Sequence, residues 1–119
     1  MGKYVDGFVV PVKKDRLDDY RKLCETAGQV WKEYGALDYV ECVAEDVKPG
    51  KLTSFPQSVM LEPDETVIFS WIVYESREAR DRINEQVMKD PRLAGMDITN
   101  MPMDGKRMFW GGFEIFHRA

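Results

Sequence analysis

Two stretches of this sequence carry large apolar side chains on both faces that an extended chain presents. In residues 65–74 the two alternating sets are Val67, Phe69, Trp71 and Val73 on one side, and Ile68, Ile72 and Tyr74 on the other. Residues 107–116 repeat the pattern, with Met108, Trp110 and Phe116 alternating with Phe109, Phe113 and Ile115. Because successive side chains of a strand point to opposite faces, a sheet that contains these strands needs cover on both faces.

Two other segments have the period of an amphipathic helix. Residues 15–34 carry an apolar stripe at steps of three and four, formed by Leu17, Tyr20, Cys24, Ala27, Trp31 and Tyr34. We expect Asp15 to begin this helix with Asp18 in a capping-box-like position, and Gly35 to end it. A second helix is predicted over residues 76–90, with its end at the residue before Pro91.

The order of these elements predicts the fold. Residues 4–12 and 36–44 are rich in β-branched and aromatic residues and predict two more strands. Residues 45–63 form an insert in which a short helix is expected near 54–57, and residues 91–104 are expected to be a methionine-bearing loop. The sequence therefore predicts an α+β ferredoxin-like βαββαβ fold, a four-stranded antiparallel sheet with two helices on one face, in a single domain over residues 1–119.

Two helices can cover only one face of this sheet. An aromatic side chain buries about 150–250 Å², so three or four bare ones exceed the patch of a few hundred Å² that a monomer normally exposes. The simplest cover is a second copy of the chain, sheet against sheet. We therefore predict a homodimer through the sheet face.

Charge and hydropathy disfavour two classes of partner. The net charge of −4 argues against a general affinity for nucleic-acid phosphates. The strand at 65–74 also lacks the basic-Gly-aromatic-Gly pattern of RNA-recognition motifs, which leaves RNA binding as the weakest alternative. No apolar run reaches the roughly 18–20 residues that span a bilayer, and the N-terminus does not have the pattern of a signal peptide. We expect no membrane association and a cytoplasmic location.

The residues that most often carry catalysis or bind metals are few. Cys24 and Cys42 are not part of a CxxC motif and are expected to be buried, reduced thiols. The single histidine, His117, lies close to the C-terminus, where residues are commonly mobile. One histidine and two distant cysteines do not make a zinc site. The residues therefore predict neither a metal nor a cofactor, and they identify no catalytic group.

Polar residues within the predicted strands are the first candidates for a binding pocket. Asp6, Glu41 and Ser70 each interrupt an apolar strand, and a few polar groups converging on an apolar cavity are typical of a small-molecule site. The other interpretation places them at the solvent or at the rim of the dimer.

The segment 100–107 is the second candidate. Asn100, Asp104 and Arg107 would lie on a loop closing over a pocket lined by Trp71 and Trp110, with Arg107 as a partner for an anion. The simpler interpretation is a tight turn at Asp104-Gly105. The functional hypothesis is a homodimer that binds a small apolar or aromatic metabolite; the alternative is a dimeric interaction or stress-associated protein without a ligand.

Several segments together resemble a known family. KYVDGFVVPV, YGALDYVECVAEDVKPGK, FSWIVYESREARD, MKDPR and NMPMDGKRMFWGGFE are similar to the YbaA-like family of uncharacterised bacterial proteins, a domain of unknown function. The resemblance extends over residues 3–114. It implies a ferredoxin-like fold of the dimeric α/β-barrel superfamily and no established activity. That superfamily includes small monooxygenases, isomerases and stress-response proteins, so whether this chain is an enzyme stays open.

Overall fold

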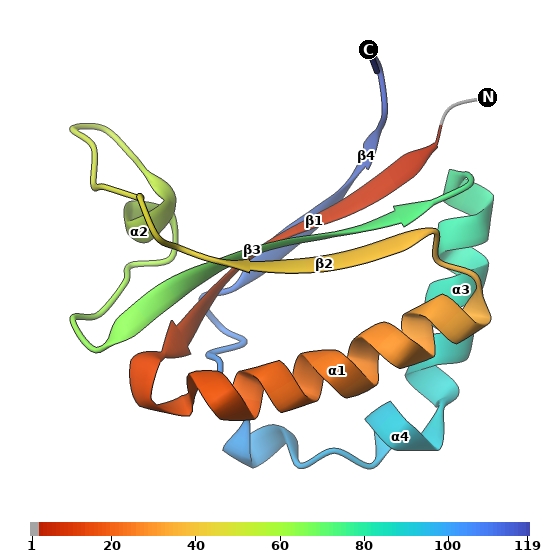
Figure 1. Cartoon of the computed structure of the whole chain (residues 1–119), viewed down its shortest axis with the longest axis horizontal. Helices are drawn as coiled ribbons and strands as arrows, with labels where there is room; N and C mark the ends of the chain where they lie inside the picture. Colours follow the sequence, from red (N-terminus) through yellow and green to blue (C-terminus); the bar gives the residue numbers. More distant parts are fainter. Residues whose placement is uncertain (1–2) are drawn as a thin grey trace.

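The computed structural model describes residues 3–119 and contains one antiparallel sheet with the strand order β2-β3-β1-β4 (Figure 1). The strands are β1 (Tyr4–Lys13), β2 (Asp38–Val43), β3 (Glu65–Tyr74) and β4 (Phe109–Glu114). The two central strands are β1 and β3, which pair along their whole length from Tyr4 opposite Tyr74 to Lys13 opposite Glu65. The predicted ferredoxin-like βαββαβ fold is confirmed.

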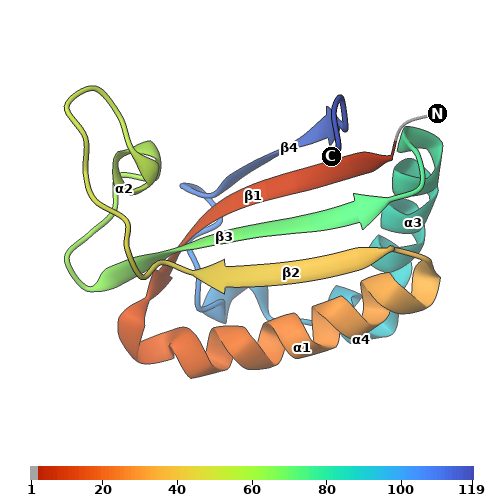
Figure 2. The same cartoon turned by 45° about the horizontal axis from the view of Figure 1, so that its top comes forward.

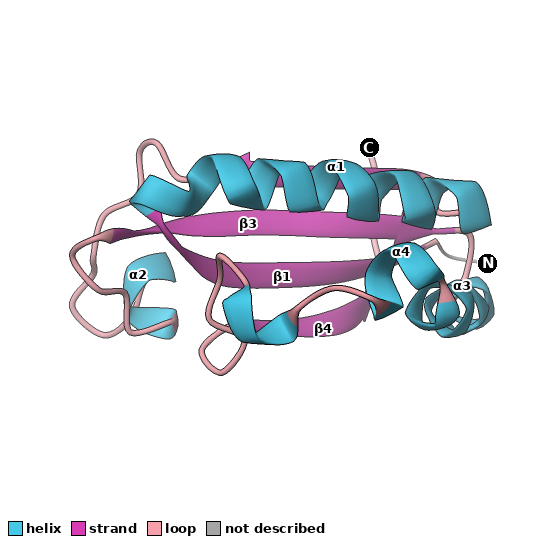
Figure 3. Ribbon diagram, turned by 90° about the horizontal axis from the view of Figure 1, so that it is seen from below, coloured by secondary structure: helices cyan, strands magenta, loops and turns pink. Residues whose placement is uncertain are grey.

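The two long helices, α1 (Leu17–Tyr34) and α3 (Arg77–Lys89), lie on one face of the sheet, as predicted. α1 runs along the sheet, whereas α3 crosses near the end of α1 (Figure 3). The chain then continues through α4 (Pro91–Ala94) and the 3₁₀ turn η2 (Ile98–Asn100), which lie under the side of the sheet that α1 leaves open.

The ends of several elements differ from the predictions. α1 follows a 3₁₀ turn, η1 (Lys14–Arg16), and its N-cap residue Arg16 makes no side-chain cap, so the predicted start at Asp15 is wrong. Gly35 ends α1 at a φ of 118°, a left-handed conformation that favours glycine. The loop predicted at 91–104 contains α4, whose first turn is capped by Asp90 accepting a hydrogen bond from the Arg92 amide at 2.9 Å.

The last strand is shorter than expected. It covers Phe109–Glu114 rather than residues 107–116, because the preceding residues form a turn in which the Met108 amide donates to the Asp104 carbonyl at 3.1 Å. The insert between β2 and β3 contains the predicted short helix, α2 (Phe55–Ser58), whose N-cap Ser54 accepts a hydrogen bond from the Gln57 amide. α2 lies at the end of the sheet that is distant from α3 (Figure 2).

The two faces of the sheet are covered unequally. The inner face carries the core, in which Ile72 and Tyr74 pack against Val30, Ile83 and Val87 of the helices. On the outer face only one end is covered, where the insert residue Val59 packs on Val9 and Val67. The remaining outer face exposes three phenylalanines, Phe69 at 43%, Phe109 at 46% and Phe113 at 64%.

Candidate functional site

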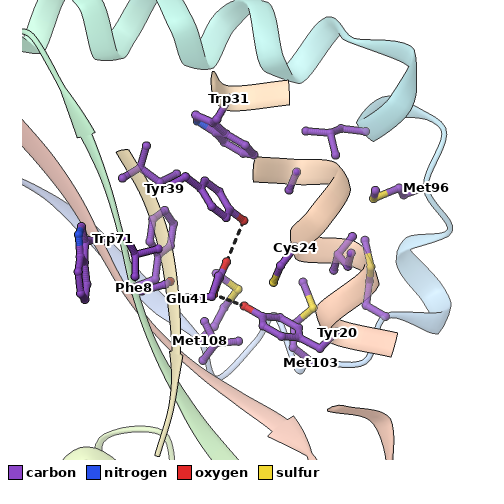
Figure 4. Close-up of a pocket in the computed structure, with 18 of the residues that line it drawn as sticks. Phe8, Tyr20, Cys24, Trp31, Tyr39, Glu41, Trp71, Met96, Met103 and Met108 are labelled. Atoms are coloured by element: carbon purple, nitrogen blue, oxygen red, sulfur yellow. Dashed lines mark hydrogen bonds between the residues drawn. The ribbon is translucent and has the colours of Figure 1, made fainter. Parts of the chain in front are cut away.

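A cavity of about 320 Å³ lies between α1 and the inner face of the sheet (Figure 4). α3 crosses the end of α1 (Figure 3), and on the side that α1 leaves open the wall is formed by Leu93 of α4 and by Met96, Met101 and Met103 from the chain after it. Its walls are almost entirely apolar. Five methionines contribute to them, namely Met88, Met96, Met101, Met103 and Met108.

One carboxylate, Glu41 of β2, faces this cavity. Its Oε1 accepts a hydrogen bond from the Tyr20 hydroxyl at 2.9 Å, and its Oε2 accepts one from the Tyr39 hydroxyl at 2.8 Å. Tyr39 and Glu41 are two residues apart on one strand and so project from the same face, while Tyr20 comes from α1 (Figure 4). The two phenols therefore hold the carboxylate from both sides.

The protonation states around Glu41 are controlled by burial. Desolvation, followed by the negative charge of Glu41, raises the pKa of Tyr20 and of Tyr39 far above the ordinary range of a phenol. The same two causes raise the pKa of the Cys24 thiol to about 12. All three groups are therefore protonated near neutral pH, and the two phenols remain donors to the carboxylate.

The strand next to Glu41 contributes a small hydroxyl. Ser70 of β3 lies opposite Glu41 in the register, is buried, and lines the cavity together with Phe8 of β1. The polar groups at the cavity wall therefore gather around Glu41, with Ser70 from β3 and Tyr20 and Cys24 from α1.

A second polar cluster surrounds Asp6, which is only 1% exposed. Its Oδ2 lies 3.1 Å from the Tyr74 hydroxyl and 3.4 Å from the Asn84 amide nitrogen, and its Oδ1 lies 3.7 Å from Arg80 Nε. Burial raises the pKa of the Asp6 carboxyl, and Arg80 opposes that effect. Asn84 also accepts a hydrogen bond from the indole of Trp31 at 3.0 Å, which connects this cluster to a wall of the cavity.

The two tryptophans that were predicted to line one pocket, Trp71 and Trp110, lie on different faces of the sheet. Trp71 packs against Phe69 on the outer face, with ring centroids 5.7 Å apart, and points away from Glu41 (Figure 4). Trp110 lies opposite Phe8 and stacks on its ring at 6.0 Å, so it approaches the inner face near the cavity while remaining 53% exposed. The structure therefore does not bring Trp71 and Trp110 together.

The predicted loop residues have separate roles. The carbonyl of Asn100 accepts a hydrogen bond from Arg16 at 3.1 Å, which holds the segment against the start of α1. Arg107 is occupied by Asp104 at 2.8 Å and by Glu65 at 2.6 Å, away from the cavity. What this segment contributes to the cavity wall is Met101 and Met103.

Of the eight residues proposed from sequence, three border the cavity: Glu41 and Ser70, whose side chains lie on the inner face, and Trp71, whose side chain lies on the outer face. The three polar neighbours that sequence reasoning missed are Tyr20, Cys24 and Tyr39. A signal for them existed: Tyr20 and Cys24 are one helical turn apart on the apolar stripe of α1, and Tyr39 shares the parity of Glu41. Polar tips on an otherwise apolar stripe indicate a site where those tips meet a partner.

The structure also tests the predictions about metal ligands, cysteines and membrane spans. Within residues 3–119 no three His, Cys, Asp or Glu side chains gather as metal ligands would. Both cysteines are free and partly exposed, so the prediction that they are buried is wrong. No helix in the described part of the chain is long and apolar enough to cross a membrane.

Comparisons with known proteins agree with this fold. Residues 3–105 match the family described as "Protein of unknown function (DUF1428)". The chain is 52% identical over 112 residues to the uncharacterized protein YbaA of Escherichia coli K12, covering 94% of this chain and 95% of that protein. An identical level of similarity is found with YbaA of Shigella flexneri.

Among solved structures, a dimeric ferredoxin-like protein from an uncultured marine organism aligns over 100% of both chains, with a TM-score of 0.64 and 9% identity. A nipsnap family protein of unknown function from Agrobacterium tumefaciens C58 aligns with a TM-score of 0.58 and 13% identity, over 95% of this chain and 87% of that one. At these identities the structural likeness concerns the fold alone.

Proposed function

The chain belongs to the DUF1428 family, whose function is unknown. From the geometry of the cavity we propose that the protein is a homodimer that binds a small apolar or aromatic molecule between α1 and the sheet. The observation that carries this proposal is the cavity of about 320 Å³ with Glu41 held at its wall by two tyrosines. Ligand sites are typically concave and apolar, with a few fixed polar groups that orient the ligand.

The polar groups at the wall support a binding role over simple packing. Glu41 is half-buried, and removing a carboxylate even partly from water is costly unless its hydrogen bonds are satisfied; an apolar residue at position 41 would avoid that cost. Each carboxylate oxygen of Glu41 instead accepts a hydrogen bond from a tyrosine hydroxyl. Such preorganised geometry is what a binding site needs to recognise a polar group.

The homodimer is supported by the outer face of the sheet. Phe69, Phe109 and Phe113 are exposed on the face opposite the helices, and the marine protein with the same fold is described as dimeric. A second copy placed sheet against sheet would cover these rings and leave the cavity, on the other face, free to bind.

A thermal-shift screen with a metabolite library tests the binding proposal. The affinity of any hit is then measured for a variant in which a larger side chain fills the cavity. Leu23 lines the cavity from α1 and is only partly buried, so Leu23→Trp adds a ring there with room to adjust. We expect Leu23→Trp to weaken a hit by about tenfold or more, because it occupies the space of the ligand.

Glu25→Trp is the matched control, because Glu25 is exposed on the same helix and is not among the residues lining the cavity. It should leave the affinity of the hit unchanged. A library without hits, or a hit that Leu23→Trp does not weaken, would favour the alternative of a dimeric protein without a ligand in this cavity.

A further inference from the structure

The side chains lining the cavity include a single charge. Of the residues at its wall, only Glu41 is charged, and Lys, Arg and His are absent from it. None of the ion pairs found among residues 3–119 includes Glu41. Arg21 reaches a smaller hollow on another side of Glu41, but it is 67% exposed and pairs with Asp18 at 3.3 Å. The carboxylate therefore faces the cavity without a cation.

The hydrogen bonds of Glu41 leave acceptor capacity toward the cavity. Each carboxylate oxygen can accept two hydrogen bonds, and each accepts one from a tyrosine. Both donors are neutral phenols, because their pKa values are raised by burial and by the charge of Glu41 itself. Two hydrogen bonds from neutral groups orient the negative charge but do not neutralise it.

The surroundings of the carboxylate suit an organic cation. Charges interact more strongly in an apolar cavity than in water, and the aromatic rings of Tyr20, Tyr39 and Trp31 add faces on which a cation is attracted. A hard metal ion is a poor match, because it prefers six or more oxygen ligands and the wall offers one carboxylate. An anion would meet the charge of Glu41 and find no basic side chain on the wall.

We propose that the ligand is an amine that is protonated at neutral pH and carries an apolar or aromatic body, with its ammonium group against Glu41 and its body along the methionine wall. This inference rests on the proposed binding function and names the chemical class of its ligand. The five methionines are flexible and polarizable, so the wall can adapt to bodies of different shape. The site is therefore selective for the head group and tolerant of the body.

Three probes with one body and different head groups test this inference by calorimetric titration: 4-phenylbutylamine, 4-phenylbutan-1-ol and 4-phenylbutanoate. We expect the wild-type protein to bind the amine at least about tenfold more tightly than the alcohol and not to bind the carboxylate. In Glu41→Gln the affinity for the amine should fall at least about tenfold more than the affinity for the alcohol, because only the amine loses an opposite charge. Glu45→Gln, at an exposed glutamate just after β2, should behave as the wild type.

The outcomes separate the two proposals. If amine and alcohol bind equally to the wild type, and Leu23→Trp weakens both, the cavity binds ligands but the inferred cationic head is wrong. A preference for the amine that is undiminished in Glu41→Gln also overturns the inference. If the wild type does not bind the amine, the inferred ligand class is wrong, and the metabolite screen with Leu23→Trp decides the binding function by itself. If Glu41→Gln does not fold, the affinities of the wild type for the amine, the alcohol and the carboxylate still test the inferred head group.

Discussion

Cys24 shows how strongly the environment of Glu41 changes a single residue. The thiol lies between Tyr20, Tyr39 and the carboxylate on the cavity wall (Figure 4). Desolvation and the adjacent negative charge raise its pKa to about 12. Since the thiolate is the nucleophile, we expect burial and the charge of Glu41 to make this partly exposed cysteine slow to react.

In a Cys42→Ser background, we expect iodoacetamide to modify Cys24 at pH 8 roughly a thousandfold more slowly than an unperturbed thiol, because so little thiolate is present. The rate should rise about tenfold per pH unit from pH 8 to pH 10 without reaching a plateau. Glu41→Gln removes one source of the raised pKa and should accelerate the reaction, which mass spectrometry can follow. Equal rates in Glu41→Gln and in the control Glu45→Gln would contradict this account.

At the scale of elements, Arg107 anchors the insert that covers one end of the outer face. Its guanidinium contacts Glu65 at 2.6 and 2.8 Å and also donates to the carbonyl oxygens of Val59 and Met60. Glu65 is only 4% exposed, and its hydrogen bonds with Arg107 lower the pKa of its carboxyl group. A turn just before β4 thus holds residues that lie far away in the sequence.

Arg107→Met should loosen the insert, because it leaves the Glu65 carboxylate buried without its partner. We expect amide hydrogen exchange over residues 59–65 to become roughly tenfold faster or more. Lys13→Met breaks a pair with Asp64 in which the side chains are 42% and 64% exposed, so it should have a much smaller effect.

The same pair predicts a dependence on pH. Because the folded-state pKa of Glu65 is lowered, its stabilising effect is complete above the ordinary pKa of a glutamate and is lost as the pH falls through the lowered value. Wild-type protection of residues 59–65 should therefore decrease in acid. Protection that is equal in wild type and Arg107→Met at neutral pH would show that Arg107 does not anchor the insert.

At the scale of the whole molecule, the uncovered outer face determines the expected assembly. Phe113 is 64% exposed on that face, and burying a phenylalanine contributes about 1.5–3 kcal/mol. A two-fold interface uses each residue twice, so a charge at this position would disturb two contacts at once.

Phe113→Glu should therefore weaken the dimer by at least about a hundredfold and shift the mass measured by light scattering at micromolar concentration from dimer to monomer. Gln29→Glu places the same charge at an exposed position of α1 and should leave the dimer intact. A wild-type protein that is monomeric at this concentration would refute the homodimer, and binding in the cavity would remain to be tested separately.

Much of the fold could be predicted because it depends on local periodicity. The stripe of α1 and the alternation of β3 are properties of neighbouring residues, and both elements formed near the expected positions. Boundaries were less accurate where distant contacts decide them. Arg107 and Met108, for example, belong to a turn rather than to β4, because they bond to Asp104 and, for Arg107, also to Glu65.

The sequence by itself determined that the chain forms a βαββαβ sheet with apolar side chains on both faces, because period two and period 3.6 follow from backbone geometry. Only the tertiary structure decided which face remains open and where the cavity lies. Both depend on the crossing of α3 over the end of α1 and on the position of the insert, and neither is a property of one segment. The meeting of Tyr20 with Glu41, 21 residues apart, likewise follows from packing α1 on β2.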